Sequence, residues 1–180
     1  MRLFFGLGLE REAAMELDRW RSAHLLCDGR PVPVANFHLT LAFIGDVAPR
    51  QLETLSEAAD ELLVRTGQGP GDMLIDQIGY WPRPGILWAG PSRWPAELNQ
   101  LARALQSLAR RYGARLEKRP FQPHVTLFRG CQTPPAAPPD APAIGLTCDC
   151  LSLYESRRQR GGVTYTSLID WQLASPGHSA

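Results

Sequence analysis

Residues 37–44 read FHLTLAFI and residues 121–128 read FQPHVTLF, and both stretches contain a His, an apolar residue, a Thr and a Leu in that order. Each stretch has the apolar and β-branched character of a strand. Side chains two residues apart in a strand point to the same face, so each His lies beside its Thr while the alternate apolar residues enter the core. The two histidines, His38 and His124, are 86 residues apart in a chain of 180 residues. This spacing predicts two similar lobes that face each other.

Strand and helix patterns alternate on both sides of these motifs. Apolar runs predict strands, and apolar residues three and four positions apart predict amphipathic helices. The predicted strands span residues 2–9, 37–44, 72–80, 86–89, 121–128, 144–155 and 163–173, and the predicted helices span residues 10–26, 49–66 and 95–112. The proline-rich segment 133–142 predicts an exposed loop. The sequence therefore predicts an α+β fold with helices on the outer faces of the sheets.

The composition is that of an ordinary globular protein. Hydrophobic residues make up 44% of the chain and charged residues 21%, which argues against wholesale disorder. The length fits one domain, which we predict to span residues 1–174, with a frayed tail at residues 175–180. No apolar run is long enough to cross a membrane and no secretory signal is visible, so we expect a cytoplasmic protein. The four cysteines fit neither a disulfide framework nor a paired zinc motif.

Positive charge is concentrated in one part of the chain. Residues 103–160 contain ten Arg or Lys and four Asp or Glu, although the net charge of the whole chain is only +1. Basicity of the whole protein would favour the coating of a nucleic-acid duplex, whereas a local excess of Arg favours a face for phosphate groups. A solvated helix face without a ligand explains the charge excess equally well.

Two imidazoles and two hydroxyls are the groups that displacement at phosphorus needs. One group takes a proton from the nucleophile and another gives a proton to the leaving oxygen, and His does both near neutral pH because its ordinary pKa is about 6.5. Thr hydroxyls donate hydrogen bonds to phosphoryl oxygens. A single His of this kind could be structural, but two identical His–Thr pairs require a shared reason. The predicted catalytic residues are therefore His38, His124, Thr40 and Thr126.

Two other kinds of catalytic site find less support in the residues. Two histidines without a nearby Asp, Glu or Cys leave the ligand set of a metal ion short, so we predict no metal site. A Ser-His-Asp triad would need a nucleophile elbow, and the sequence contains no such motif.

The paired motifs, the stretch RLFFGLGL at residues 2–9 and the stretch RPFQPHVTLFR at residues 119–129 resemble the two-histidine (2H) phosphoesterase superfamily. The similarity is greatest to its RNA 2′,3′-cyclic phosphodiesterases, also called the 2′-5′ RNA ligase family. This resemblance implies two pseudo-symmetric lobes, each with an antiparallel sheet lining a central cleft and helices outside. It also implies hydrolysis of RNA 2′,3′-cyclic phosphodiester ends to 2′-phosphomonoesters without a metal or an organic cofactor. In that reaction His38 would be the proton donor to the leaving 3′ oxygen, and His124 the proton acceptor that activates water.

Three further residues are candidate substrate contacts. Arg129 resembles a substrate-binding Arg of the family, although strand alternation places its side chain on the face of Leu127. Arg119, before the same strand, could extend a basic rim together with Lys118. Phe128 stands where the family usually has a small residue, and alternation places its ring on the face of the His and Thr. There it would narrow or reshape the cleft.

The expected partner is RNA with a 2′,3′-cyclic phosphate end, such as a tRNA fragment, or a small cyclic nucleotide, bound by a monomer. Two alternatives keep the same catalytic groups, namely 2′-5′ RNA ligation and hydrolysis of a small cyclic nucleotide. A third alternative is a non-enzymatic module for single-stranded RNA, in which exposed rings such as Tyr80 and Trp81 stack on bases. Core packing is the better interpretation of those two rings, and binding alone would not need a duplicated His–Thr motif.

Overall fold

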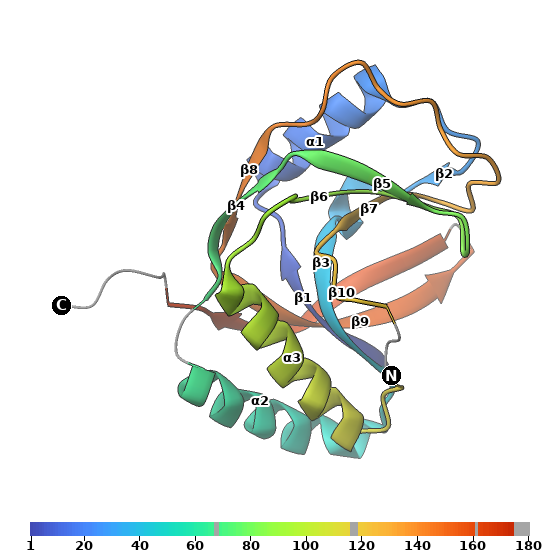
Figure 1. Ribbon diagram of the computed structural model, residues 1–180. Coiled ribbons are helices and arrows are strands. Elements are labelled where there is room, and N and C mark those ends of the chain that lie inside the picture. Colours follow the sequence, from blue (N-terminus) through green and yellow to red (C-terminus); the bar gives the residue numbers. More distant parts are fainter. Residues whose placement is uncertain (67–68, 116–118, 161, 175–180) are drawn as a thin grey trace.

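The computed structural model describes residues 1–66, 69–115, 119–160 and 162–174, and it has the expected α+β architecture (Figure 1). Its strands are β1 (Arg2–Gly8), β2 (Arg30–Pro31), β3 (His38–Asp46), β4 (Gly71–Ile75), β5 (Gln77–Trp81), β6 (Ile86–Gly90), β7 (Val125–Arg129), β8 (Ile144–Cys148), β9 (Cys150–Gln159) and β10 (Gly162–Gln172). Its helices are α1 (Arg11–His24), α2 (Leu52–Thr66) and α3 (Ala96–Arg111), with short 3-10 helices η1 (Val34–Asn36) and η2 (Pro49–Gln51). Lys118 and the expected tail at residues 175–180 lie outside the described residues.

Two halves of one antiparallel sheet form the two lobes. The strand order is β10-β9-β1-β3-β7-β6-β5, and the short strand β2 also pairs with β7. Between β3 and β7, the register of the described residues consists of one pair, Leu39 opposite Val125. The strands on either side of this narrow contact are therefore two lobes, and each lobe carries one of the His motifs on the strand at the contact.

Helices α1 and α3 pack against the lobe that they do not follow in sequence. Helix α1 comes after β1 but packs beside β8 and is hydrogen-bonded to β7 in the other lobe. Helix α3 comes after β6 but packs on β3, and α2 covers α3, as the lower part of Figure 1 shows. The buried stripe of α3, at helical spacing, consists of Leu98, Leu101, Leu105 and Leu108. Among the described helices, none combines the length and the apolarity that a membrane crossing requires.

Two of the predicted strands are each divided in the structure. The predicted strand 72–80 becomes β4 and β5 with a break at Asp76, and the predicted strand 144–155 becomes β8 and β9 with a break at Asp149. The Asp76 carboxylate accepts hydrogen bonds from the backbone N–H and the hydroxyl of Ser92, and the Asp149 carbonyl accepts one from the Leu173 N–H. Strands β4 and β8 then pair with each other as a second sheet. Each stretch thus serves two sheets, which the apolar pattern does not reveal.

The strand predicted at 121–128 is also shorter in the structure. It begins at Val125, directly after His124, because Pro120 and Pro123 lack the N–H that a strand ladder requires. The two-residue strand β2 is too short to leave a periodic signal in the sequence.

Arg21 is a buried charged residue that connects α1 to β7. Its Nη1 donates hydrogen bonds to the carbonyls of Val32, at 2.7 Å, and Leu127, at 3.0 Å. Its guanidinium also lies over the rings of Phe37, at 5.0 Å, and Phe128, at 5.5 Å. Since Phe37 precedes His38 and Leu127 follows Thr126, the Arg21 side chain contacts a residue next to each motif.

We expect Arg21→Met to lower the free energy of unfolding by about 2–4 kcal/mol, because it removes the Arg21 donor from the buried Val32 carbonyl and one of the two donors to the Leu127 carbonyl, the other being the Val32 N–H. Urea unfolding followed by circular dichroism measures the change. Arg19→Met is the matched control, since Arg19 is an exposed residue of the same helix, and surface substitutions usually change stability by less than about 0.5 kcal/mol. Equal losses in the two variants would contradict the role assigned to Arg21.

Candidate active site

The antiparallel contact between Leu39 and Val125 puts both motifs on one face of the sheet. Residues that flank such a pair are themselves opposite each other, so each His stands across from the Thr of the other motif. Leu39 and Val125 are fully buried on the core face, and the polar residues project from the other face. A local twofold axis through the pair therefore relates the two motifs and brings together His38, Thr40, His124 and Thr126.

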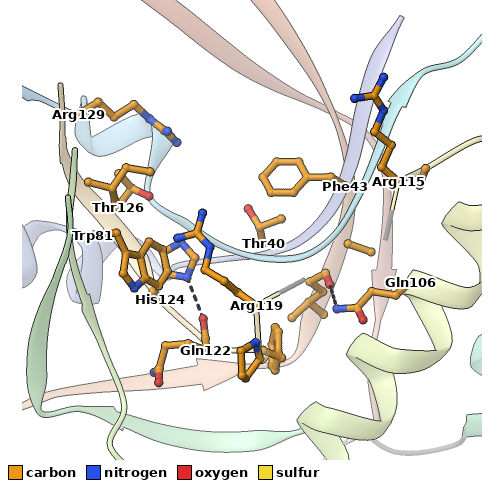
Figure 2. Close-up of a pocket in the computed structure, with 16 residues that line it drawn as sticks. Thr40, Phe43, Trp81, Gln106, Arg115, Arg119, Gln122, His124, Thr126 and Arg129 are labelled. Atoms are coloured by element: carbon orange, nitrogen blue, oxygen red, sulfur yellow. Dashed lines mark hydrogen bonds between the residues drawn. The ribbon is translucent and has the colours of Figure 1, made fainter. Parts of the chain in front are cut away.

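Both imidazoles are held in the same way. Nδ1 of His38 donates to the carbonyl of Asn36 at 2.7 Å, and Nδ1 of His124 donates to the carbonyl of Gln122 at 2.8 Å, the bond drawn in Figure 2. Because a carbonyl oxygen only accepts, Nδ1 carries the proton and Nε2 of each neutral ring is an acceptor. His38 Nε2 accepts a hydrogen bond from the Thr40 hydroxyl at 2.9 Å. The backbone thus selects the tautomer in which Nε2 is the basic nitrogen.

Aromatic rings enclose His38 and suppress its charge. The ring centroids that lie within 6 Å of it belong to Phe4, Tyr154 and Tyr165. Burial lowers the pKa of His38 to about 4, against the opposing effect of the Asn36 carbonyl, and the charges of Arg129 and His124 lower it further. His38 is therefore neutral at pH 7 in the free protein. It is not among the residues that line the pocket and lies behind Thr40, which does line it.

This lowered pKa makes His38 a source of acid lability. The unfolded chain binds a proton at this residue as the pH falls below about 6.5, but the folded chain does so only near pH 4, so the stability falls over that window. Between pH 7.5 and pH 4.5 the wild type should lose about 2 kcal/mol more than His38→Gln. Urea unfolding at the two pH values measures this difference, and equal losses in the two proteins would contradict it.

His124 is enclosed by a different set of groups. The ring of Trp81 meets the imidazole edge-on at a centroid distance of 4.6 Å, and the Arg119 guanidinium lies over that Trp ring at 5.0 Å. Burial lowers the pKa of His124, the carbonyl of Gln122 opposes this, and the charges of Arg129 and Arg119 lower it further. Figure 2 shows Trp81 and Arg119 beside His124. The interpretation of Trp81 as a core residue is corrected here, because its ring lines the pocket.

A β-bulge three residues after each His changes which side chains face the pocket. The register of β1 with β3 leaves Leu41 out, and the register of β6 with β7 leaves Leu127 out. One extra residue inverts the alternation that follows it. The residues five positions after each His, Phe43 and Arg129, therefore join the His face and line the pocket. Figure 2 shows these two side chains on opposite sides of it.

A side chain from a helix fixes each bulge. Nε2 of Gln106 in α3 donates to the Leu41 carbonyl at 3.2 Å, and Nη1 of Arg21 in α1 donates to the Leu127 carbonyl at 3.0 Å. An extra residue in a strand is left out of the ladder pairing, and these side chains donate to its carbonyl. The Leu127 carbonyl also accepts a hydrogen bond from the Val32 N–H, at 2.8 Å. The two lobes thus repeat the motif, the bulge and the support of the bulge.

The bulge at Leu127 exchanges the places that alternation predicts for Phe128 and Arg129. Arg129 is exposed and lines the pocket near Thr126. Phe128 is buried in the hydrophobic core against the Arg21 guanidinium and is not one of the lining residues. The expectation that Phe128 narrows the cleft is therefore wrong, and Arg119 and Arg129 are the two expected substrate contacts that lie at the pocket.

The pocket has a volume of about 250 Å³ and a positive lining. None of its described lining residues is Asp or Glu, whereas three are Arg: Arg115, Arg119 and Arg129. Sequence reasoning missed Phe43, Gln106 and Arg115. A signal for Phe43 was present, because it follows His38 by the same five positions by which Arg129 follows His124. A site of this kind attracts an anion. It presents the His124 imidazole directly, with His38 hydrogen-bonded to the lining residue Thr40.

Comparisons with known proteins agree with this geometry. A family model described as LigT-like phosphoesterase matches residues 7–88 and 90–165, so each matched segment contains one His motif. A curated Escherichia coli (strain K12) protein named RNA 2′,3′-cyclic phosphodiesterase is 37% identical over 174 residues, which is 96% of either chain. A protein of the same name from Aeropyrum pernix is 28% identical over 166 residues, covering 86% of this chain and 92% of the relative.

The solved structures show the same relationship. The crystal structure of Escherichia coli LigT complexed with 3′-AMP superposes with a TM-score of 0.83 at 37% identity, covering 96% of this chain and 97% of that one. A crystal structure of a Thermus thermophilus protein, with a TM-score of 0.76 at 24% identity over 98% of this chain and 100% of that one, shares the fold. With the repeated motif, the two-lobed sheet and the match of the family model across both lobes, the chain belongs to the LigT-like phosphoesterase family.

Proposed function

We propose that this protein is an RNA 2′,3′-cyclic phosphodiesterase, a cytoplasmic monomer that hydrolyses the cyclic end of an RNA fragment to a 2′-phosphomonoester. The observation that carries the proposal is the contact of Leu39 with Val125, which presents both His–Thr pairs on one face of the sheet. The relatives that cover most of the chain support the choice of substrate, since they are named for this activity.

The two histidines divide the proton transfers of this reaction. Nε2 of His124 takes a proton from water as the water oxygen attacks phosphorus. Nε2 of His38, once protonated, gives its proton to the 3′ oxygen as the bond from phosphorus to that oxygen breaks. The 2′ oxygen keeps the phosphate. The hydrogen bonds from Nδ1 to the backbone hold both rings with Nε2 as the reacting nitrogen.

Hydroxyl and guanidinium groups stabilise the charge that develops on the phosphoryl oxygens. Thr40 and Thr126 line the pocket, and the Thr40 hydroxyl is bonded to the His38 imidazole. Arg129 adds a positive charge at the same end as Thr126. Hydrogen bonds to an oxyanion inside a partly desolvated pocket are worth more than in water. The Thr40 hydroxyl, which donates to His38 Nε2 in the free protein, is then released to the phosphate when that nitrogen is protonated.

The opposite side of the pocket suits a nucleoside. The ring of Phe43 is 63% exposed although it lines a pocket, and an exposed aromatic face stacks on a base. The solved structures of the Escherichia coli relative include complexes with 3′-AMP and with NADP⁺. The second of these molecules carries a 2′-phosphate on adenosine, which is the group that the proposed reaction produces.

The chemistry of the lining residues supports catalysis without a metal. Divalent cations prefer carboxylate and carbonyl oxygens, whereas the described lining offers three guanidinium groups and no carboxylate. The imidazoles supply the acid and the base, and the hydroxyls and guanidiniums supply the charge stabilisation. No step is left for a Lewis acid.

The test is incubation with a short RNA that ends in a 2′,3′-cyclic phosphate. We expect a 2′-phosphomonoester, identified by ³¹P NMR, and the same rate in excess EDTA as in its absence. Loss of activity with EDTA and recovery with a divalent cation would replace the proposal by a metal-assisted mechanism. A 3′-phosphomonoester as the product would mean that the 2′ oxygen, and not the 3′ oxygen, is the leaving group. RNA joined through 2′-5′ bonds as the main product would favour ligation.

A further inference from the structure

Two cysteines far apart in the sequence lie against each other. Cys27, in the segment before β2, and Cys131, after β7, are 104 residues apart, and their sulfur atoms are 2.7 Å from each other. Sequence reasoning found no disulfide framework because spacing along the chain does not show which loops meet. The pair lies outside the candidate active site, since neither cysteine lines the pocket.

Polar contacts hold the two segments together next to the sulfur atoms. The carboxylate of Asp28 accepts hydrogen bonds from the backbone N–H groups of Gln132, at 3.0 Å, and Thr133, at 3.2 Å, and from the Thr133 hydroxyl at 2.9 Å. A side chain at Gly29 would place its Cβ 2.6 Å from the sulfur of Cys131, so glycine permits this close approach. The pairing of the sulfurs is thus built into the backbone on both sides.

The two thiols differ in access and reactivity. Cys27 is partly exposed, and its sulfur accepts a hydrogen bond from the Gly29 N–H at 3.3 Å. Cys131 is buried, and burial together with the neighbouring Cys27 raises its pKa to about 11. The Tyr80 hydroxyl and the Gly85 carbonyl fix the backbone of Cys131. Cys27 is therefore the thiol that meets a reagent from solvent, and Cys131 is positioned to attack Cys27 afterwards.

A metal ion fits this arrangement less well. Cys27, Asp28 and Cys131 are the candidate ligands, but the oxygens of Asp28 already accept three hydrogen bonds. Two thiolates on one tetrahedral zinc lie about 3.8 Å apart, given zinc–sulfur bonds of about 2.3 Å. The sulfurs here are closer than that.

We propose that Cys27 and Cys131 are a site of reversible oxidation by small disulfides, and that the resulting bond clamps the segment before β2 to the end of β7. The Cys27 thiolate attacks one sulfur of the small disulfide, forms a mixed disulfide and releases one small thiolate. Cys131 then loses its proton, attacks the Cys27 sulfur and displaces the second small thiolate. One small disulfide is thereby reduced to two thiols while the two cysteine thiols become one disulfide.

The clamp would act close to the substrate-binding end of the pocket. Cys131 follows Arg129 by two residues, and Arg129 pairs with Arg30 of β2, three residues after Cys27. The bond would close a loop of about 100 residues, and loops of that length gain most from a crosslink because the unfolded chain loses more entropy. The melting temperature should rise by roughly 5–10 °C on oxidation.

The test treats the full chain, first reduced with dithiothreitol, with oxidised glutathione. We expect the intact mass to fall by two hydrogens, two of the four thiols to become unreactive in denaturant, and peptide mapping to find Cys27 linked to Cys131. In Cys131→Ser the first step should remain and the second should fail, so that glutathione stays attached to Cys27. Cys150→Ser, which removes another partly exposed cysteine, should still form the bond and show the rise in melting temperature.

Four results would overturn the proposal. The first is that all four cysteine thiols of the chain stay reactive after treatment at a glutathione potential that oxidises ordinary dithiols. The second is a bond to Cys148 or Cys150 instead. The third is a bond between Cys27 and Cys131 without any change in melting temperature, which would remove the clamp. Stoichiometric zinc in the purified reduced chain, lost in Cys27→Ser, would assign the pair to a metal.

Discussion

Replacing either histidine by Ala should lower kcat on an RNA 2′,3′-cyclic end by about 10²–10⁴-fold, which is the usual contribution of a positioned general acid or base. His124→Ala removes the group that takes the proton of water, and His38→Ala removes the group that protonates the 3′ oxygen. Single-turnover kinetics on a short cyclic-ended RNA measure the loss. KM should change less than kcat, because Arg129, Thr126 and the other pocket residues still hold the phosphate.

Matched variants separate this effect from damage to the fold. His24→Ala removes a histidine that stacks on Trp20 of α1 and does not line the pocket, so its turnover should equal that of the wild type. Thr40→Ala and Thr126→Ala should lose less than either histidine variant, since each removes one neutral donor. Near-normal turnover in folded His38→Ala and His124→Ala would mean that the pair is structural.

The sequence predicted the shared face of each His and Thr because that relation is local. Only one residue of uninterrupted strand separates His38 from Thr40, and over that distance alternation holds whatever the rest of the fold does. One residue further on, the bulges at Leu41 and Leu127 invert the alternation. They depend on partners from distant helices, Gln106 and Arg21, and therefore could not be found from the pattern of the strand alone.

Apart from the strand shortened by Pro120 and Pro123, the mispredicted parts depend on contacts between distant segments. The breaks at Asp76 and Asp149 arise because β4 and β8 pair with each other. The sequence of neither segment indicates which strand it pairs with. The same holds for the meeting of Cys27 with Cys131. Trp81 was interpreted as a core residue because its hydrophobicity is visible in sequence, whereas its contact with His124 is not. Composition and periodicity thus predict elements, and topology decides which side chains meet.

The pH dependence of the reaction follows from the lowered pKa values of both histidines. Hydrolysis needs one neutral and one protonated imidazole, so kcat/KM should follow a bell whose limbs report the free protein. The pKa of His38 is about 4 and that of His124 lies below 6.5. Both limbs of the bell should therefore lie below pH 6.5, and kcat/KM should fall about tenfold per pH unit above the higher of the two pKa values.

The negative charge of a bound phosphate raises the pKa values of both histidines, so the bell for kcat should lie at higher pH than the bell for kcat/KM. A maximum of kcat/KM above pH 7 would contradict the burial of the two rings as the controlling effect.

A change of leaving group assigns the two roles, which the bell cannot do because the two titrations interact. In a phosphodiester whose leaving 3′ oxygen is replaced by nitrophenolate, departure needs no proton, so the acid becomes dispensable while water still needs its base. The loss of rate in His38→Ala relative to the wild type should shrink from about 10²–10⁴-fold toward a few-fold. His124→Ala should keep most of its loss on the same substrate. Release of nitrophenolate, followed by absorbance, gives both ratios from one assay. Rescue of His124→Ala in place of His38→Ala would mean that the acid and the base are exchanged. Rescue of neither variant would contradict the role of His38 as the group that protonates the leaving 3′ oxygen.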